Sequence, residues 1–193
     1  MKSNRKAKTV RRTARRNTKS LTLSARVARL EKQLLVASPT AAAVATAIAK
    51  ARFVNLDEKG KPTTGEHVAV YDRSTGITWA ADPLEGGKAM NHEAAMNACN
   101  GLDLLGLKDW RAPTITELLS IVDYGRSDPA VDPAHFKGPF TWTWTSTPYA
   151  GNPSGAAWGV SFGLGLSSWS GHYNSSGLRA RAVCSGQPLG LSV

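Results

Sequence analysis

The apolar residues near the N-terminus recur at alternating spacings of four and three. These positions are Leu23, Val27, Leu30, Leu34, Ala37, Ala41, Val44, Ile48 and Ala51. This spacing is the a/d seam of a left-handed coiled coil. It predicts a helical oligomerisation segment over residues 20–52, the stalk, with a homotrimer as the expected assembly. Its bulkiest seam residues are Leu23, Val27, Leu30 and Leu34. An amphipathic helix packed on its own chain is the alternative.

The periodicity changes twice after this seam begins. Ser38 is a suitable N-cap and Pro39 suits the first helical position, so we expect the helix to break and restart there. From about Phe53 short alternating runs replace the helical period. His67–Tyr71 and Ile77–Ala81 are expected to be strands, joined by a turn that ends in glycine.

Two helices are expected in the region after residue 53. The first covers Asn91–Leu105, with an apolar face of Ala94, Ala95, Ala98, Leu102 and Leu105. The second begins at Thr114, because Thr114 and Glu117 have the spacing of a capping box. Its buried side is expected to comprise Leu118, Leu119, Ile121 and Val122. Short strands with two helices indicate an α+β domain over residues 53–193, the head.

Charge divides the chain more sharply than its total of +10 suggests. Residues 1–50 hold 13 Lys and Arg against one acid, whereas the remainder has 11 basic and 13 acidic residues. A uniformly basic nucleic-acid-binding domain is therefore excluded. Residues 1–19, the arm, are expected to be disordered when free, with anchoring contacts from Arg11, Arg12, Arg15 and Arg16. The arm's partner is nucleic acid, an anionic surface or an acidic socket on a larger assembly. No membrane span is expected.

Five motifs of the head resemble, in order, those of the DUF1566 family, also described as the Lcl C-terminal domain. They are Val70–Trp79, Asp109–Thr114 with Glu117–Leu118 and Ile121–Asp123, Trp144–Thr147, Ala157–Phe162 and Leu178–Cys184. Ala112 departs from the usual Leu, and the closing Cys184 comes one or two positions late. The resemblance implies a C-type-lectin-like fold with a twisted antiparallel sheet, two helices and a large irregular region that exposes a ligand face.

The two cysteines, Cys99 and Cys184, have no zinc-binding spacing and form either one long-range disulfide or two free thiols. The family resemblance implies a disulfide between the first helix and the last strand. Two buried, inert thiols are the alternative.

Catalytic and metal-binding patterns are weak. The four histidines are scattered, and neither GxSxG nor HExxH occurs. We therefore expect no enzyme and no cofactor. Asp128 and Asp132 with nearby carbonyls are a weak alternative for a hard cation, since they lack the dense carboxylate spacing of such sites.

Residues 159–177 contain no charged side chain and combine small residues with large amphipathic ones. This composition is typical of antibody paratopes, where rigid aromatic anchors stand among adaptable hydrogen-bonding groups. The predicted ligand-binding residues are Ser167, Ser168, Trp169, His172, Tyr173 and Asn174. The segment also corresponds to the one that varies in lectin-like domains diversified by retroelements. An ordinary Gly/Ser-rich loop with Trp169 buried is the alternative. Trp79, Trp110, Trp142, Trp144 and Trp158 are expected in the core.

Together these features predict a non-enzymatic, homo-oligomeric bacteriophage fibre located on the virion, and outside the cell after lysis. The arm would bind virion structural proteins, with nucleic acid possible through the arm only. The heads would act as an adhesin for a host-surface receptor, either glycan or protein. A virion decoration protein without a receptor is one alternative, and a bacterial surface adhesin is another.

Overall fold

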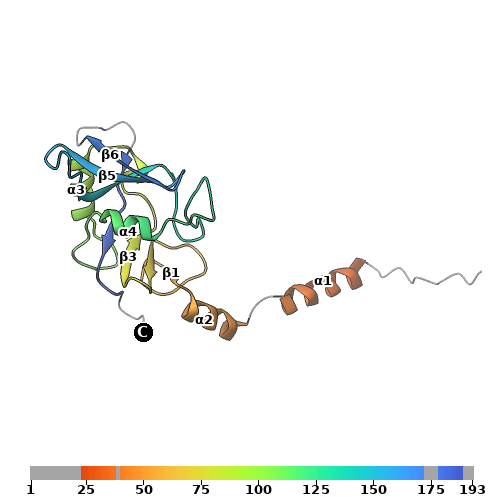
Figure 1. The fold of residues 1–193 in the computed structure, drawn as a ribbon. Coiled ribbons are helices and arrows are strands. Elements are labelled where there is room, and N and C mark those ends of the chain that lie inside the picture. Colours follow the sequence, from red (N-terminus) through yellow and green to blue (C-terminus); the bar gives the residue numbers. More distant parts are fainter. Residues whose placement is uncertain (1–22, 38–39, 172–177, 189–193) are drawn as a thin grey trace, which may run out of the picture. The chain divides into compact units, whose positions relative to one another are not determined.

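The computed structural model describes residues 23–37, 40–171 and 178–188 (Figure 1). They form two compact units, one that reaches to Val44 and one that starts at Ala45. None of the helices in these ranges has the length and apolarity that a membrane crossing requires. The predicted arm, with its four anchoring arginines, lies outside the described residues.

The stalk contains two helices, α1 (Leu23–Ala37) and α2 (Ala41–Lys50). The predicted restart as a second helix is confirmed, but its N-cap is Thr40 and not the predicted Ser38, and Ser38 and Pro39 lie outside the described residues. The restart is capped by Thr40, whose Oγ1 accepts a hydrogen bond from the Ala43 amide at 3.2 Å. On α1 the seam residues Leu23, Val27 and Leu30 are exposed, and the side chain of Leu34 is not among those described. The coiled coil stays a prediction.

The first sheet of the head is antiparallel, in the order β1-β2-β3-β8. Its strands are β1 (Phe53–Leu56), β2 (Ala69–Asp72), β3 (Ile77–Ala80) and β8 (Val183–Cys184). The predicted hairpin between β2 and β3 is confirmed. Gly76 closes its turn with a φ of +71°, which favours glycine, and its amide donates to the Asp72 carbonyl at 2.8 Å.

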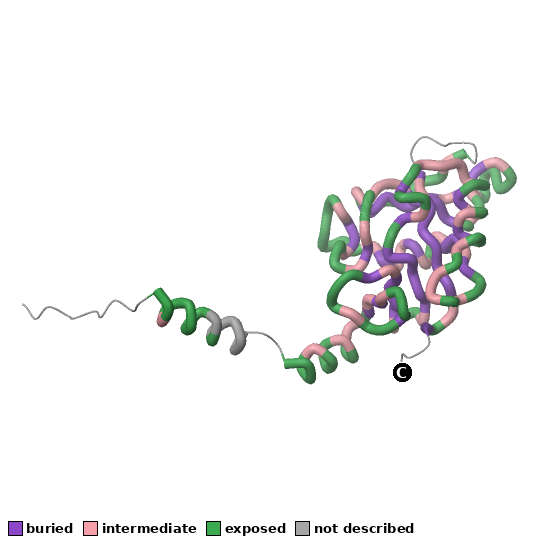
Figure 2. The backbone as a smooth tube through the Cα atoms, turned by 180° about the vertical axis from the view of Figure 1, so that it is seen from behind, coloured by how far each residue is buried: buried purple, intermediate pink, exposed green. Residues whose placement is uncertain are grey.

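The second sheet has the order β6-β5-β4-β7. Its strands are β4 (Trp142–Pro148), β5 (Ala156–Ser161), β6 (Leu166–Gly171) and β7 (Leu178–Arg179). β4, β5 and β6 pair antiparallel, whereas β7 runs parallel to β4. The head is therefore a mixed α+β domain, as expected. Buried segments of chain fill its interior (Figure 2), and they include most residues of β2, β3, β5 and β8.

Two helices and one short 3₁₀ turn, η1 (Glu85–Gly87), accompany the sheets. α4 (Ile115–Ser120) packs against β4 and β5, and its Leu118 is fully buried. The other helix, α3, spans His92–Asn100 and is shorter than the predicted Asn91–Leu105.

The prediction for α3 was wrong in length and only partly correct about the buried side, on which Ala95 is buried as predicted. Gly101 ends the helix, and Leu105 has a φ of +57°, which no α-helix accommodates. The residues buried on α3 are Ala95 and Cys99, four positions apart, whereas Ala94 is exposed. Alanine side chains are too small to mark the buried side of a helix reliably. The pattern of alanines in the sequence therefore included the exposed Ala94 in the predicted buried side.

The segment after β7 joins the two sheets, because β7 belongs to one and β8 to the other. Arg181 lies in this crossing and is almost completely buried. Its guanidinium donates to three backbone carbonyls: Ala80 at 2.8 Å, Ala81 at 2.5 Å and Lys137 at 2.6 Å. Burial lowers the pKa of Arg181 to about 10, so the group is still cationic at neutral pH. It connects the crossing segment to the end of β3 and to the loop before β4.

Replacing Arg181 with Met should lower the free energy of unfolding by about 3 kcal/mol, because three buried carbonyls would lose their donor. Urea denaturation of the full chain measures this change. Arg126→Met is the matched control: Arg126 is half-exposed and pairs only with surface carboxylates, so its loss should change the stability by less than about 0.5 kcal/mol. Equal effects of the two substitutions would contradict this role of Arg181.

Candidate binding face

Three aromatic side chains gather at the outer edge of the second sheet. Trp158 on β5 and Trp169 on β6 are directly opposite in the antiparallel register. Tyr149 stacks on Trp169, with ring centroids 4.8 Å apart and planes inclined by 9°, and meets Trp158 edge-on at 5.8 Å. Trp169 is still 53% exposed. We call Tyr149, Trp158 and Trp169 the aromatic face.

A tight turn after β4 places Tyr149 in this group. The Tyr149 amide donates to the Ala156 carbonyl at 2.9 Å, and the Asn152 amide donates back to the Tyr149 carbonyl at 3.0 Å. Gly151 is needed within the turn, because a Cβ there would lie 2.7 Å from Cε1 of the Tyr149 ring. The ring therefore lies over the turn and reaches Trp169.

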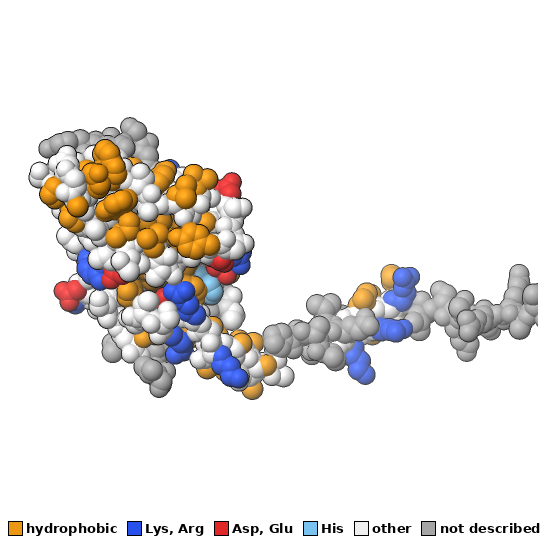
Figure 3. Space-filling view, in the orientation of Figure 1, with side chains coloured by type: hydrophobic (Ala, Val, Ile, Leu, Met, Phe, Trp, Pro, Cys, Tyr) orange, Lys and Arg blue, Asp and Glu red, His pale blue; other side chains and the backbone are white. Residues whose placement is uncertain are grey.

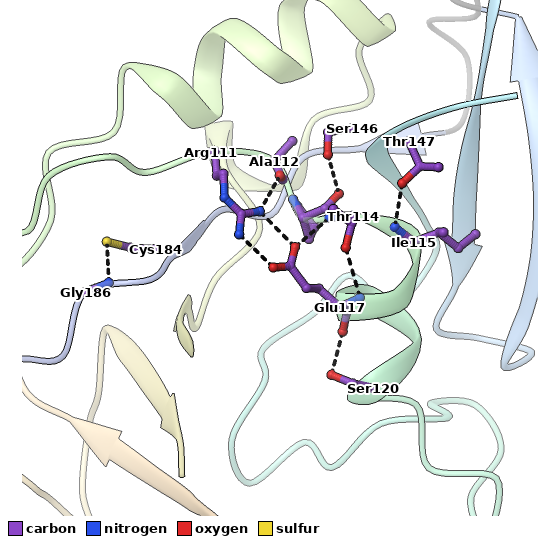
Figure 4. Close-up of polar contacts among 11 residues, drawn as sticks. Arg111, Ala112, Thr114, Ile115, Glu117, Ser120, Ser146, Thr147, Cys184 and Gly186 are labelled. Atoms are coloured by element: carbon purple, nitrogen blue, oxygen red, sulfur yellow. Dashed lines mark hydrogen bonds and ion pairs between the residues drawn. The ribbon is translucent and has the colours of Figure 1, made fainter. Parts of the chain in front are cut away.

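Residues of the motif Asp109–Thr114 form a hydrogen-bonded network with Glu117 at the start of α4 (Figure 4). Arg111 donates to both carboxylate oxygens of Glu117, at 2.8 and 2.7 Å. Glu117 also accepts the Thr114 amide at 2.7 Å, while Thr114 Oγ1 accepts the Glu117 amide at 3.2 Å. The predicted capping box is thus confirmed. The Arg111 hydrogen bonds, more than the Thr114 amide, lower the pKa of Glu117.

Residues at and just before the start of α4 also form hydrogen bonds with β4. Thr147 Oγ1 accepts the Ile115 amide at the start of α4 at 3.0 Å, and the Ser146 amide donates to the Pro113 carbonyl at 2.8 Å. Because Tyr149 follows directly after β4, these contacts fix the point from which its turn departs. The motif residues therefore position the aromatic face without belonging to it.

Exposed large hydrophobic side chains cluster beside the aromatic face. Within the described part of the head they are Tyr124, Leu164, Leu166 and Trp169. All four lie on the β5–β6 hairpin or next to it, since a Cβ on Gly165 would approach the Tyr124 ring within 3.7 Å. Figure 3 shows hydrophobic side chains gathered over β5, β6 and α4 on this side of the head. Exposed large hydrophobic side chains gathered in this way mark an interaction site.

Charge is absent from this region of the sequence. Residues 138–178 contain no Asp, Glu, Lys or Arg, and they include all of β4, β5 and β6. The aromatic face is therefore suited to a ligand recognised by shape, stacking and hydrogen bonds rather than by ionic contacts.

Three of the six predicted ligand-binding residues lie within the described part of the chain. Ser167, Ser168 and Trp169 are exposed on β6, whereas His172, Tyr173 and Asn174 lie outside the described residues. Trp169 is not buried, so the interpretation as an ordinary loop with a core tryptophan was wrong. The prediction also treated Ser167–Trp169 as part of an irregular region, whereas the structure assigns them to a strand.

Sequence analysis missed Tyr149 and placed Trp158 in the core, whereas Trp158 is only half-buried. Trp142 is also half-buried, and the core prediction is confirmed for Trp79, Trp110 and Trp144. One signal for Tyr149 was available: it opens a long irregular stretch between strands, and such stretches are often functional. The stacking partner could not be found from spacing, because it depends on the β5–β6 register.

The weaker candidate sites have structural roles. Asp132 pairs with Arg126 at 3.3 Å and accepts the Ala134 amide, and Asp128 is exposed. No group of three potential metal ligands occurs among the described residues. Of the histidines, His67 contacts the His135 carbonyl at 2.8 Å and His92 the Thr145 carbonyl at 3.0 Å.

The implied disulfide is not formed in the structure. Cys99 and Cys184 are both buried free thiols. Each faces a different backbone carbonyl: Cys99 Sγ lies 3.7 Å from the Arg181 oxygen and Cys184 Sγ 2.8 Å from the Lys108 oxygen. Burial raises the pKa of Cys99 to about 12, which makes it an unreactive core residue.

Comparison with known proteins gives one match. The family described as the Lcl C-terminal domain matches residues 68–184, which run from just before β2 to the end of β8. Neither a curated protein nor a solved structure shows a significant match to the chain.

Glu117→Gln should reduce the free energy of unfolding by about 1.5 kcal/mol at pH 7. The glutamine side chain is neutral and has a single acceptor oxygen, so it cannot accept the two charge-assisted hydrogen bonds that Arg111 donates to the carboxylate. The folded-state pKa of Glu117 is lowered, so this contribution is complete above its unfolded pKa of about 4.3 and is lost as the pH falls through the folded value. Urea denaturation at pH 7 and pH 3 should show the two proteins converging in acid.

The control for this measurement is Glu58→Gln, at an exposed carboxylate. It should leave the stability unchanged at both pH values. An equal stability difference between wild type and Glu117→Gln at pH 7 and pH 3 would contradict the ionic origin of the effect.

Proposed function

The chain belongs to the Lcl C-terminal domain family, and from this premise we propose that it is a non-enzymatic virion fibre whose head binds a host-surface receptor. The head takes the C-type-lectin-like form that this family implies. Its two small sheets, two helices and long connections support that assignment. The receptor is a glycan or a protein on the host cell.

The observation that carries the proposal is the exposed, uncharged aromatic face. A 53% exposed Trp169, stacked on Tyr149 and sharing its side of β6 with Ser167, supplies an aromatic anchor beside a small hydrogen-bonding group, whereas Ser168 points to the opposite side of the strand. Tryptophan and tyrosine are the residues that most often dominate binding energy at interfaces. A protein with no ligand for this surface would expose it to non-specific association.

The rest of the chain fits a fibre. The exposed apolar residues of α1 are the proposed contact between copies, and a trimer is the proposed assembly. The arm carries nine basic residues and no acid, which suits attachment to virion structural proteins. Copies held together by the stalk would bind a repetitive cell surface with avidity, so each head needs only weak affinity.

The basic arm also supports a second candidate function. In a decoration protein, the arm would bind capsid or packaged genome, and the head would have no receptor. The two functions share one architecture and differ in whether the aromatic face binds a cell. Substitution of that face therefore separates them.

Trp169→Ala should reduce attachment of the full chain to host cells at least tenfold, because an exposed aromatic anchor contributes at least about 1.4 kcal/mol. Fluorescently labelled protein bound to cells measures this loss. Lys59→Ala, at an exposed position in the β1–β2 connection, is the control and should attach normally.

Incorporation into virions is a second readout, on which the two parts of the chain should have opposite effects. Trp169→Ala protein should still assemble into virions, whereas a chain without residues 1–19 should attach to cells and fail to be incorporated. Unchanged attachment by Trp169→Ala would refute the receptor function and favour the decoration protein.

Light scattering tests the stalk separately. The full chain should have the mass of a defined oligomer, and Leu30→Asp should be a monomer because it places a carboxylate in the apolar seam. Arg29→Ala changes the neighbouring position outside the seam and should keep the wild-type mass. A monomeric wild type would show that α1 is an amphipathic helix without an oligomeric role.

A further inference from the structure

Within the described residues, β6 is an unprotected edge strand. It is the outermost strand of the second sheet and pairs with β5 at each of its six residues, from Ser161↔Leu166 to Ala156↔Gly171. Proteins usually protect such edges with charged side chains, proline or a bulge that interrupts the pairing. β6 has no charged residue, no proline and no register shift against β5.

The hydrogen bonds of β5 show which groups of β6 face outward. The Ala156 and Trp158 carbonyls accept from Tyr149 and Thr145, and both therefore point toward β4. Alternate residues of a strand turn their backbone groups to opposite sides. Ala157, Gly159 and Ser161 thus face β6, where their partners are Ser170, Ser168 and Leu166.

The remaining residues of β6 are Ser167, Trp169 and Gly171. Their N–H and C=O groups point away from β5, to the open edge. Among the described residues, nothing pairs with these backbone groups. Ser167, Trp169 and Gly171 alternate with inward-facing residues along β6. Their outward-facing backbone groups therefore have the spacing that an added antiparallel strand requires.

We propose that β6 pairs antiparallel with β6 of a second copy of this chain, about a two-fold axis. Three features favour a second copy as the occupant. The strand is uncharged, so identical strands meet without repulsion. A two-fold axis through Trp169 or Ser168 matches outward-facing residues with outward-facing residues in both strands. The stalk would also hold copies at high local concentration, and in this the pairing rests on the proposed function. Because a two-fold contact joins copies in pairs, it would connect two of the three heads of a trimer.

This pairing would change the binding site. Opposite residues of antiparallel strands point to the same face of a sheet, and neighbouring strands lie about 4.8 Å apart. With the axis through Trp169, the Trp169 side chains of the two copies, each stacked on its own Tyr149, would therefore lie side by side. With the axis through Ser168, each Trp169 would lie opposite Ser167 of the other copy. Two small aromatic faces would become one continuous ligand surface across both heads.

Cysteine cross-linking of the full chain tests the pairing. Ser168→Cys should form an intermolecular disulfide under mild oxidation if the axis passes through residue 168, and Trp169→Cys if it passes through residue 169. The native Cys99 and Cys184 are buried and do not compete. Ser185→Cys, exposed after β8 of the other sheet, is the control. One of the two β6 variants should cross-link at least tenfold faster than this control.

Ser167→Pro, added to the faster variant, provides a second test. It removes only an outward-facing N–H, which edge strands tolerate, so the head should still fold while the rapid cross-linking is lost. The pairing is refuted if neither cysteine exceeds the control, or if Ser167→Pro leaves the rate unchanged. Attachment that depends on Trp169 without cross-linking would retain the receptor function and leave the edge open to a strand from another protein.

Discussion

The architecture of the head depends on how one buried cation is satisfied. The short crossing from β7 to β8 carries the chain from one sheet to the other, and Arg181 lies at its centre. A guanidinium removed from water is very unfavourable unless its donors are used. The carbonyls of Ala80, Ala81 and Lys137 supply the acceptors, and they come from two segments distant in sequence. This contact therefore connects the crossing to the end of β3 and to the loop before β4, beside the apolar packing of Val70, Trp79 and Val183 with Val160 between the two sheets.

A second ionic contact joins a buried carboxylate to a half-exposed arginine. The fully buried Asp72 receives two hydrogen bonds from Arg52, at 3.0 and 2.7 Å, and Arg52 also donates to the Ser120 carbonyl at the end of α4. Burial alone would raise the pKa of Asp72, but hydrogen bonds from Arg52 and Ser74 outweigh it and lower the pKa. These charges stabilise the frame, whereas the segment with β4, β5 and β6 has none. Recognition at the aromatic face would accordingly respond little to salt.

Much of the frame could be predicted because its determinants are local. The β2–β3 hairpin depends on a turn glycine, and the start of α4 depends on two residues three positions apart. α3 was predicted less well, because alanines give a weak amphipathic signal and Cys99 marks the buried side only once packing is known. The disulfide inference failed for a related reason: that both cysteines are in the core says nothing about which atoms their thiols face.

The sequence by itself determined the family, the charge division, the helical seam and the uncharged character of the second sheet, since all of these are properties of residue order. Only the tertiary structure decided which aromatic residues form the face. Trp158 and Trp169 meet because of strand register, and Tyr149 joins them because of a turn in which Gly151 leaves room for its ring. Register and turn geometry result from many hydrogen bonds formed together, and no local pattern encodes them. The outward-facing groups of β6 emerged only from the bonds that β5 makes to β4.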